Sequence, residues 1–110
     1  MGEDLACREL RRLGYDVLAR RYRTRHGEID IVARDGAALV FVEVKVRQGA
    51  AFGGAGAAVT MAKQQRIVRM AAEYLARKRM PDGPCRFDVV AIDVEGGRPR
   101  IEIFTHAFTA

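Results

Sequence analysis

The stretch that decides the fold is residues 27–47, which read GEIDIVARDGAALVFVEVKVR. Two runs rich in Val, Ile and Phe flank the dipeptide Asp35-Gly36, and Asp-Gly between such runs predicts a β-hairpin. We expect the hairpin to be symmetric about these two residues, so that Asp30 faces Phe41 and Glu28 faces Glu43. In that register Asp30 and Glu43 are diagonal neighbours, about 7–8 Å apart at the backbone.

Strand alternation divides this hairpin into two faces. One face is apolar throughout and predicts core; it holds Ile29, Ile31, Val40, Val42, Val44 and Val46. The other face is mixed; it holds Glu28, Asp30, Phe41, Glu43, Lys45 and Arg47. Its crowded carboxylates raise the free energy of the folded state unless a cation neutralises them. Because Leu39 and Phe41 share this face, we expect it to be partly covered.

The charged end of the mixed face suits phosphodiester hydrolysis. That reaction needs a water nucleophile and relief of charge on the phosphate oxygens, and Mg²⁺ (or Mn²⁺) supplies both when one or two carboxylates hold it. Asp30 and Glu43 are the expected metal ligands, with the backbone carbonyl of Val44 as a further one. Lys45 points to the same side and could orient or deprotonate the water, or stabilise transition-state charge. The alternative is a solvated hairpin face on which Glu and Lys pair.

The rest of the chain predicts two helices and three more strands. Residues 3–13 and 61–79 are amphipathic at helical spacing, and Gly14 and Pro81 end them. The inward face of the second helix is expected to hold Ile67, Val68, Ala71, Ala72 and Leu75. Further strands are expected at 15–22, 86–94 and 100–104, and a mobile Gly- and Ala-rich loop at 48–60.

The resulting order, α-β-β-β-α-β-β, predicts a single α/β domain over residues 1–110 with a mixed central sheet. A helix connects the third and fourth strands, so those two could pair in parallel.

Charge favours an acidic partner. The net charge is +5, and 16 of the 19 basic residues are Arg, which can grip a phosphate with two hydrogen bonds. A basic domain of this kind favours nucleic acid or an acidic lipid surface. The alternative is a charge that only keeps the protein in solution.

Cysteine spacing and hydropathy bear on location. Cys7 and Cys85 lie far apart, so each is expected to be a buried reduced thiol. Apolar stretches are too short to span a bilayer, and charge begins at Glu3, which argues against a signal peptide. We therefore expect a cytoplasmic protein without membrane contact.

GEID at 27–30 followed by FVEVKVR at 41–47 resembles the PD-(D/E)XK nuclease superfamily. More narrowly, the chain resembles the YraN-type family of small bacterial proteins, which are similar to the archaeal Holliday junction resolvases. Residues 2–6, 52–53, 86–90 and 107–108 also fit the family pattern, as do Lys63, Ala72, Tyr74 and Leu75. The resemblance implies a restriction-endonuclease-like three-layer sandwich.

The same resemblance implies roles for four residues. Asp30 and Glu43 would bind the metal, Lys45 would be the catalytic lysine, and Glu3 would be the acidic residue that the first helix contributes. The alternative for Glu3 is a first-turn glutamate that complements the helix dipole.

Phosphate contacts are expected from basic residues on either side of the site. Arg25 precedes GEID, Arg47 ends the active strand, and Lys63 and Arg66 open the second helix. For each of them the alternative is a solvated basic residue. Asp88 lies in an apolar strand, and we expect it to make a structural hydrogen bond rather than to bind metal.

Two functions are favoured by the sequence over a third, a structural or partner-binding domain, which the basic charge makes the weakest. The first is a Mg²⁺-dependent endonuclease that acts on DNA in repair or recombination, with Holliday junction-like branched DNA as the substrate that the resemblance implies. Related resolvases act as homodimers because two symmetric cuts need two sites. The second is a nucleic-acid-binding module of the same fold that cuts poorly or not at all. Asp30, Glu43 and Lys45 favour the enzyme, since a binding module does not need carboxylates that face phosphate.

Overall fold

A computed structural model describes residues 2–48, 59–80 and 83–109. Its elements follow the predicted order: α1 Gly2–Arg12, β1 Asp16–Thr24, β2 Gly27–Asp35, β3 Ala38–Gln48, α2 Met61–Arg77, β4 Cys85–Glu95 and β5 Arg98–Phe108. Most of the loop predicted at 48–60 lies outside the described residues.

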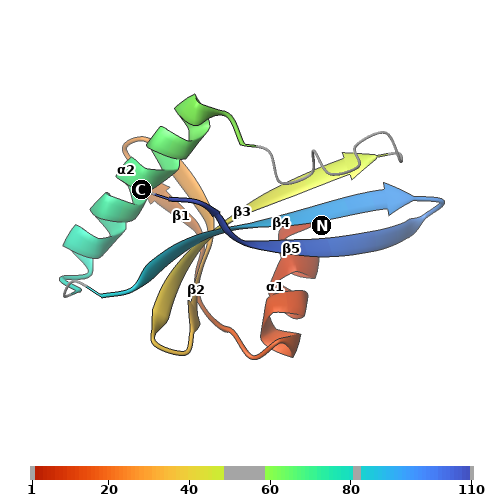
Figure 1. Ribbon diagram of the computed structural model, residues 1–110, viewed down its shortest axis with the longest axis horizontal. Helices are drawn as coiled ribbons and strands as arrows, with labels where there is room; N and C mark the ends of the chain where they lie inside the picture. The colour runs from red at the N-terminus through yellow and green to blue at the C-terminus, as the bar shows by residue number, and fades with distance from the viewer. Residues whose placement is uncertain (1, 49–58, 81–82, 110) are drawn as a thin grey trace.

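The five strands form one sheet in the order β1-β2-β3-β4-β5 (Figure 1). β3 and β4 pair in parallel, whereas the other neighbouring strands pair antiparallel. Helix α2 is the crossover that a parallel pair needs, and it connects β3 to β4. The predicted mixed sheet is therefore confirmed.

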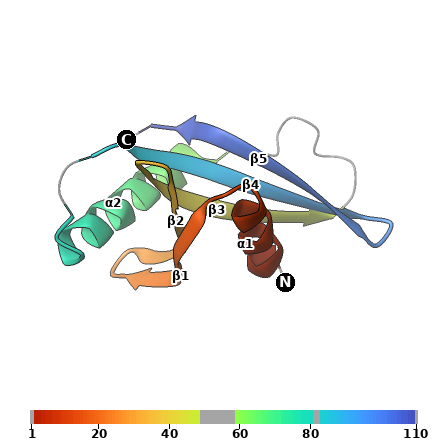
Figure 2. The ribbon, with the colours of Figure 1, turned by 90° about the horizontal axis from the view of Figure 1, so that it is seen from below.

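The two helices cover opposite faces of the sheet, which gives three layers (Figure 2). Consecutive strand residues alternate between two core clusters, as the pleat of a strand requires. On the α1 side, Ala6, Cys7 and Leu10 pack against Ile31, Ala33, Val40, Val42, Val90 and Ile92. On the α2 side, Ile67, Met70, Ala71 and Tyr74 pack against Ile29, Val32, Leu39, Phe41 and Phe87. The mixed hairpin face is covered at Leu39 and Phe41, as expected.

Each helix is stabilised at its ends by the local sequence. α1 begins with Glu3 and Asp4 and ends with two arginines, which complements the helix dipole. Thr60 is the N-cap of α2, and its hydroxyl accepts the backbone N–H of Lys63 at 3.2 Å. The buried stripe of α2 includes Met70 and Tyr74, which the prediction omitted. Ala72 is exposed, so its predicted inward position was wrong.

The β2–β3 hairpin is shifted by two residues from the predicted register. Val32 pairs with Phe41 and Asp35 pairs with Ala38, so the turn residues are Gly36-Ala37. Gly36 has φ 60, and a two-residue hairpin with glycine in its first turn position satisfies that left-handed conformation at low cost. The predicted opposition of Asp30 to Phe41, and of Glu28 to Glu43, was therefore wrong. A shift of two residues by itself does not move a side chain to the other face of its strand.

One position departs from alternation. Ile29 packs on the α2 side and Ile31 on the α1 side, although they are two residues apart, so the prediction that they share a face was wrong. In β1, Arg20 pairs with Ile31 and Tyr22 with Ile29, so that Arg21 lies across from Asp30. Arg21 has φ 49, a left-handed conformation that is rare for arginine. The backbone is therefore irregular in both strands where Arg21 of β1 lies across from Asp30 of β2.

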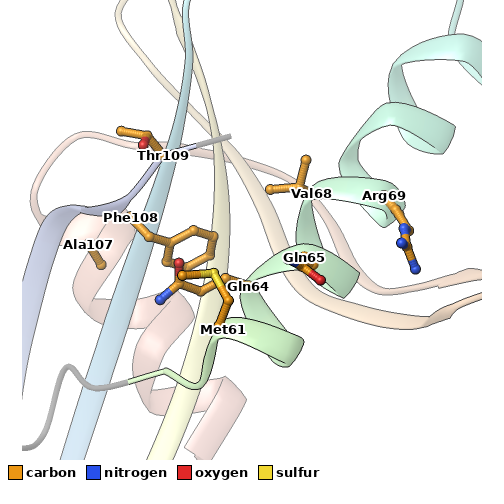
Figure 3. Close-up of a pocket in the computed structure, with 8 residues that line it drawn as sticks. All are labelled: Met61, Gln64, Gln65, Val68, Arg69, Ala107, Phe108 and Thr109. Carbon is orange, nitrogen blue, oxygen red and sulfur yellow. The ribbon is translucent and has the colours of Figure 1, made fainter.

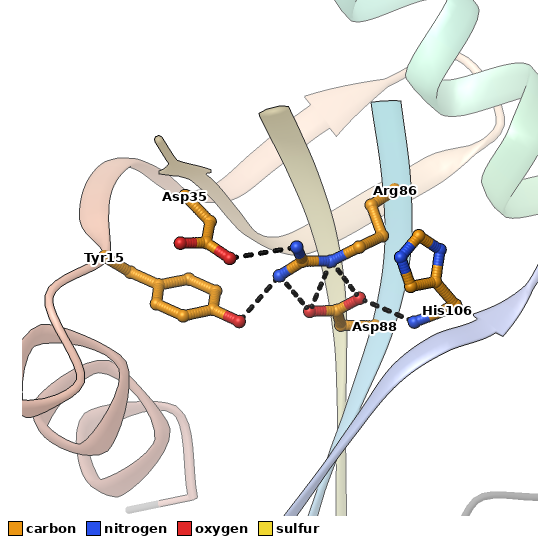
Figure 4. Close-up of polar contacts among 5 residues, drawn as sticks. All are labelled: Tyr15, Asp35, Arg86, Asp88 and His106. Atoms are coloured by element: carbon orange, nitrogen blue, oxygen red, sulfur yellow. Dashed lines mark hydrogen bonds and ion pairs between the residues drawn. The ribbon is translucent and has the colours of Figure 1, made fainter. Parts of the chain in front are cut away.

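A second polar feature, the Arg86 cluster, joins four parts of the chain (Figure 4). Its members are Tyr15, Asp35, Arg86, Asp88 and His106. Arg86 donates to both carboxylate oxygens of Asp88, to Asp35 at 2.9 Å and to the Tyr15 hydroxyl at 2.6 Å. Asp88 has 0% exposure and also accepts the backbone N–H of His106 at 3.1 Å. These are the structural hydrogen bonds that the sequence predicted for Asp88.

The cysteine and membrane predictions have separate outcomes. Cys7 is buried as expected, whereas Cys85, the first residue of β4, is exposed, so the prediction for it was wrong. Within the described ranges, no helix combines the length and the apolar character needed to cross a membrane.

Candidate functional site

Asp30 and Glu43 meet where the regular pairing of β2 with β3 ends. The last pair of that register is Ile31 with Val42, and the two carboxylates follow it on their respective strands. Oδ2 of Asp30 accepts the backbone N–H of Val44 at 2.8 Å, and the Glu43 carboxylate is near enough to raise the pKa of Asp30. The structure thus brings the two predicted carboxylates together.

Burial makes this carboxylate pair electrostatically costly. Asp30 is half-buried, and Glu43 is only 9% exposed. Burial raises the pKa of Asp30 to about 6; the negative charges of Glu43 and Glu3 act in the same direction, and the Val44 hydrogen bond opposes them. A positive charge placed between the carboxylates would offset this cost.

Lys45 lies two residues beyond Glu43 on β3 and is half-buried. Burial lowers the pKa of Lys45, the positive charges of Arg47 and Lys63 lower it further, and the charge of Glu43 opposes them. A lysine with a lowered pKa exchanges a proton closer to neutral pH than an exposed lysine does. The surroundings of Lys45 therefore favour its neutral form more than solvent does.

Glu3 shares a cavity with Asp30, whereas Glu43 does not line that cavity and pairs with Lys63 of α2. Gly2, Glu3, Arg21, Asp30, Val44 and Val46 line one open cavity of about 230 Å³. Oε1 of Glu3 accepts Nε of Arg21 at 2.8 Å, so the glutamate is paired with an arginine from β1. Glu3 thus lies in the first turn of α1, as the helix-dipole alternative required. It also lines the cavity that Asp30 lines.

Arg21 is the cavity residue that sequence reasoning missed. It comes from a basic run in β1, ARRYR, and nothing in the sequence distinguishes one arginine of this run from the others. The left-handed backbone at Arg21 sets it apart, and no pattern in the sequence signals that conformation at an arginine.

The four expected phosphate contacts divide into two groups. Lys63 forms an ion pair with Glu43, and the charges of Arg47 and Lys63 both act on Lys45, so these two residues lie at the site. Arg25 instead pairs with Glu73 of α2 at 3.2 Å, and Arg66 is exposed on α2.

The side-chain ligands available to a metal are fewer than the sequence suggested. Glu28 pairs with Arg23 at 3.3 Å, so its predicted place in the carboxylate patch was wrong. In the parts of the chain that the structure describes, no three His, Cys, Asp or Glu side chains gather to hold a metal ion. Asp30 and Glu43 remain as a pair, and Val44 lines the cavity beside Asp30.

A larger cavity lies elsewhere, between the first half of α2 and the end of β5 (Figure 3). Its volume is about 670 Å³, and its lining is Met61, Gln64, Gln65, Val68, Arg69, Ala107, Phe108 and Thr109. None of these residues is a carboxylate, and Asp30, Glu43 and Lys45 are not among them. The larger cavity is therefore separate from the carboxylate pair.

Known proteins resemble this chain over nearly its whole length. A family model described as "Uncharacterised protein family UPF0102" matches residues 2–92. A UPF0102 protein of Symbiobacterium thermophilum is 49% identical over 110 residues, covering 99% of this chain and 93% of the relative. One from Geobacter sulfurreducens is 52% identical over 108 residues, covering 97% and 84%. One from Rhodococcus opacus is 45% identical over 108 residues, covering 97% and 92%. The chain therefore belongs to the UPF0102 family, the YraN-type family that its sequence resembles.

Proposed function

We propose that this protein is a metal-dependent endonuclease that hydrolyses DNA phosphodiester bonds at Asp30, Glu43 and Lys45. The observation that carries the proposal is the half-buried carboxylate pair, in which burial and like charge raise the pKa of Asp30 to about 6. A lysine of lowered pKa lies beside the pair. Two like charges held together away from water raise the free energy of the folded protein, and a bound divalent cation would offset that cost.

The donor set fits Mg²⁺ or Mn²⁺. Mg²⁺ favours hard oxygen ligands and typically binds one or two carboxylates together with waters and substrate phosphate. Asp30 and Glu43 would hold the ion, with the Val44 carbonyl as a further ligand. The open cavity of about 230 Å³ reaches Asp30 and Val44 but is not lined by Glu43. When bound, the ion supplies an activated water and relief of phosphate charge.

The chain's own residues would prepare the reaction. The Val44 N–H holds the Asp30 carboxylate in a fixed orientation, so little reorganisation is needed. Lys45 would take a proton from the attacking water or stabilise the charge that develops on the phosphate oxygens. Glu3 pairs with Arg21 at the same cavity, so it would act by positioning that arginine unless it turns toward the ion.

Charge around the site fits a nucleic acid. Arg47 and Lys63 lie at the site, Arg21 lines its cavity, and the chain carries a net charge of +5. Branched DNA in repair or recombination, cut in the cytoplasm by a homodimer, is the specific form of the proposal. That form rests on the resemblance to the archaeal resolvases.

Cleavage assays test the proposal directly. Four-way junction, flap and linear DNA would be incubated with Mg²⁺, Mn²⁺ or EDTA and with wild type, Asp30→Asn or Glu28→Gln. Glu28→Gln is the matched control, because Glu28 lies on the same strand and pairs with Arg23. We expect metal-dependent cutting by wild type and Glu28→Gln and none by Asp30→Asn. A wild-type protein that cuts no DNA with either metal would contradict the proposal.

The second candidate is a nucleic-acid-binding module that does not cut. The ion pair between Lys63 and Glu43 favours it, because a lysine already neutralises part of the carboxylate charge. DNA binding that falls with salt but is unchanged in Asp30→Asn, without cleavage by wild type, would identify the module.

A further inference from the structure

The ion pair between Lys63 and Glu43 joins two unequal partners. The Glu43 side chain is 10% exposed, whereas the Lys63 side chain is 42% exposed. The enclosed partner is thus the carboxylate proposed to hold a metal ion, and the accessible partner is a long, flexible cation. The ammonium group of Lys63 therefore supplies, at Glu43, the positive charge that the carboxylate pair requires.

We propose that Lys63 exchanges between two partners: it neutralises Glu43 while no divalent cation is bound, and it moves to a phosphate of the DNA backbone when one binds. This inference rests on the proposed function, because it requires the metal to bind at Asp30 and Glu43. A divalent cation held by Glu43 repels the ammonium of Lys63 at contact distance. The lysine and the metal therefore compete for one carboxylate.

The backbone of Lys63 is fixed, so the exchange involves its side chain alone. Its N–H donates to the Thr60 hydroxyl that begins α2, and α2 packs on the sheet through Ile67 and Met70. From this fixed origin, four methylene groups and three donors allow the ammonium to reach more than one acceptor.

No alternative carboxylate lies close along the helix. The first turn of α2, residues 61–64, is described in full and contains no acidic residue. The charge of Lys63 also acts on Lys45, which places the two ammonium groups near each other. Once Lys63 leaves Glu43, an anion between these two lysines is the partner that fits, and a DNA phosphate supplies it.

Metal titration tests the competition without measuring activity. Calorimetry with Mn²⁺ would compare wild type, Lys63→Gln and Lys78→Gln, the last a matched change at the other end of α2. Glutamine can still donate a hydrogen bond to Glu43, which limits the loss of stability. We expect Lys63→Gln to bind Mn²⁺ about tenfold more tightly and Lys78→Gln to match wild type. In Ca²⁺, which keeps DNA uncut, Lys63→Gln should bind DNA several-fold more weakly.

A measurement on the wild-type protein guards against misfolding of the variant. The chain has only three lysines, Lys45, Lys63 and Lys78, so selective labelling gives one ¹³Cε signal for each. Mg²⁺ should shift the Lys63 signal and leave that of Lys78 unchanged.

The outcomes separate this inference from the proposed function. If wild type binds Mn²⁺ but Lys63→Gln binds it equally or more weakly, the exchange is wrong and the metal centre stands. The same conclusion follows if Mg²⁺ shifts the Lys45 signal but leaves the Lys63 signal unchanged. If wild type binds no Mn²⁺ at all, the metal centre and the exchange both fail.

Discussion

The backbone N–H of Val44 donates to Oδ2 of Asp30 at 2.8 Å, so the candidate metal ligand of β2 is tied to β3. Ile31 and Val42 are the last regular pair of the two strands; Asp30 lies one residue before Ile31, and Val44 lies two residues after Val42. The charge of Asp30 is proposed to bind metal, and its hydrogen bond to Val44 stabilises the fold. Different substitutions at position 30 can separate these two roles.

Asparagine and alanine at position 30 should differ in stability but not in cleavage. Asp30→Asn keeps an acceptor for the Val44 N–H, whereas Asp30→Ala leaves that donor without it, which costs about 1–3 kcal/mol. Urea denaturation should thus rank Asn above Ala by about that amount, while neither variant cuts DNA. Equal stability of the two variants would show that the hydrogen bond is not structural.

The stability of the metal-free protein should depend on pH through Asp30. Its pKa is about 6 in the folded protein and about 3.9 in the unfolded chain, so the folded state binds more protons between these values. Stability contributed by Asp30 therefore falls as pH rises from about 4 to 6, and the loss is complete above that window. Allowing for solvent screening of this half-buried group, we expect a loss of about 1–2 kcal/mol.

Urea titrations of wild type and Asp30→Asn across pH 4.5–7.5 would measure this effect. The wild type should lose stability relative to the variant as pH rises, and saturating Mg²⁺ should reverse the trend, because a bound cation favours the ionised carboxylate. A difference between the two proteins that stays constant with pH would contradict the assignment of the carboxylate penalty to Asp30.

Every substitution of Lys45, including arginine, should lower the rate of DNA cleavage. Arginine keeps the positive charge but cannot give up its proton, so Lys45→Arg separates proton transfer from charge stabilisation. We expect cleavage to fall by about 10²–10⁴-fold, with DNA affinity in Ca²⁺ nearly unchanged. Single-turnover rates and filter binding would measure both, with Lys78→Arg as control. Wild-type rates in Lys45→Arg would mean that Lys45 supplies only charge.

The Arg86 cluster should be a main source of stability away from the site. Arg86→Met leaves the fully buried carboxylate of Asp88 without its cation, and loss of one partner from a buried pair costs about 3–5 kcal/mol. The double variant Arg86→Met/Asp88→Leu should recover part of that loss, because no charge is left unpaired. Arg12→Met, which breaks the exposed pair with Glu9, should change stability by less than about 1 kcal/mol. Thermal and urea unfolding would rank the three.

The sequence predicted most of the fold because its signals are local. Apolar alternation in residues 27–47 determined which strand residues face the helices, and the helix between the third and fourth strands predicted their parallel pairing. The turn was misplaced because Asp35-Gly36 and Gly36-Ala37 both fit a two-residue hairpin on paper. A type I′ turn at Asp35-Gly36 needs a positive φ at both residues, but only Gly36 has one, which fits a turn with glycine in its first position.

The site was predicted less completely because part of it is not local. Asp30, Glu43 and Lys45 come from one hairpin, so periodicity alone brings them together. The break between Ile29 and Ile31 and the left-handed Arg21 depend on packing from both faces of the sheet. The Lys63–Glu43 pair depends on how α2 packs on the sheet, which no local sequence pattern predicts.

The parallel pairing of β3 with β4 sets the order in which this site can form. Leu39 pairs with Cys85 and Arg47 with Asp93, so each β3 residue meets a residue 46 positions later. The β1–β3 hairpins close through short turns within microseconds, whereas this contact must first close a long loop. A nascent chain that has left the ribosome as far as Gln48 therefore holds Asp30 and Glu43 open to water. Burial beneath α2 and beside β4 comes later, so the desolvation cost of the carboxylates falls on the last stage of folding, and Lys63 arrives with α2 to offset part of it.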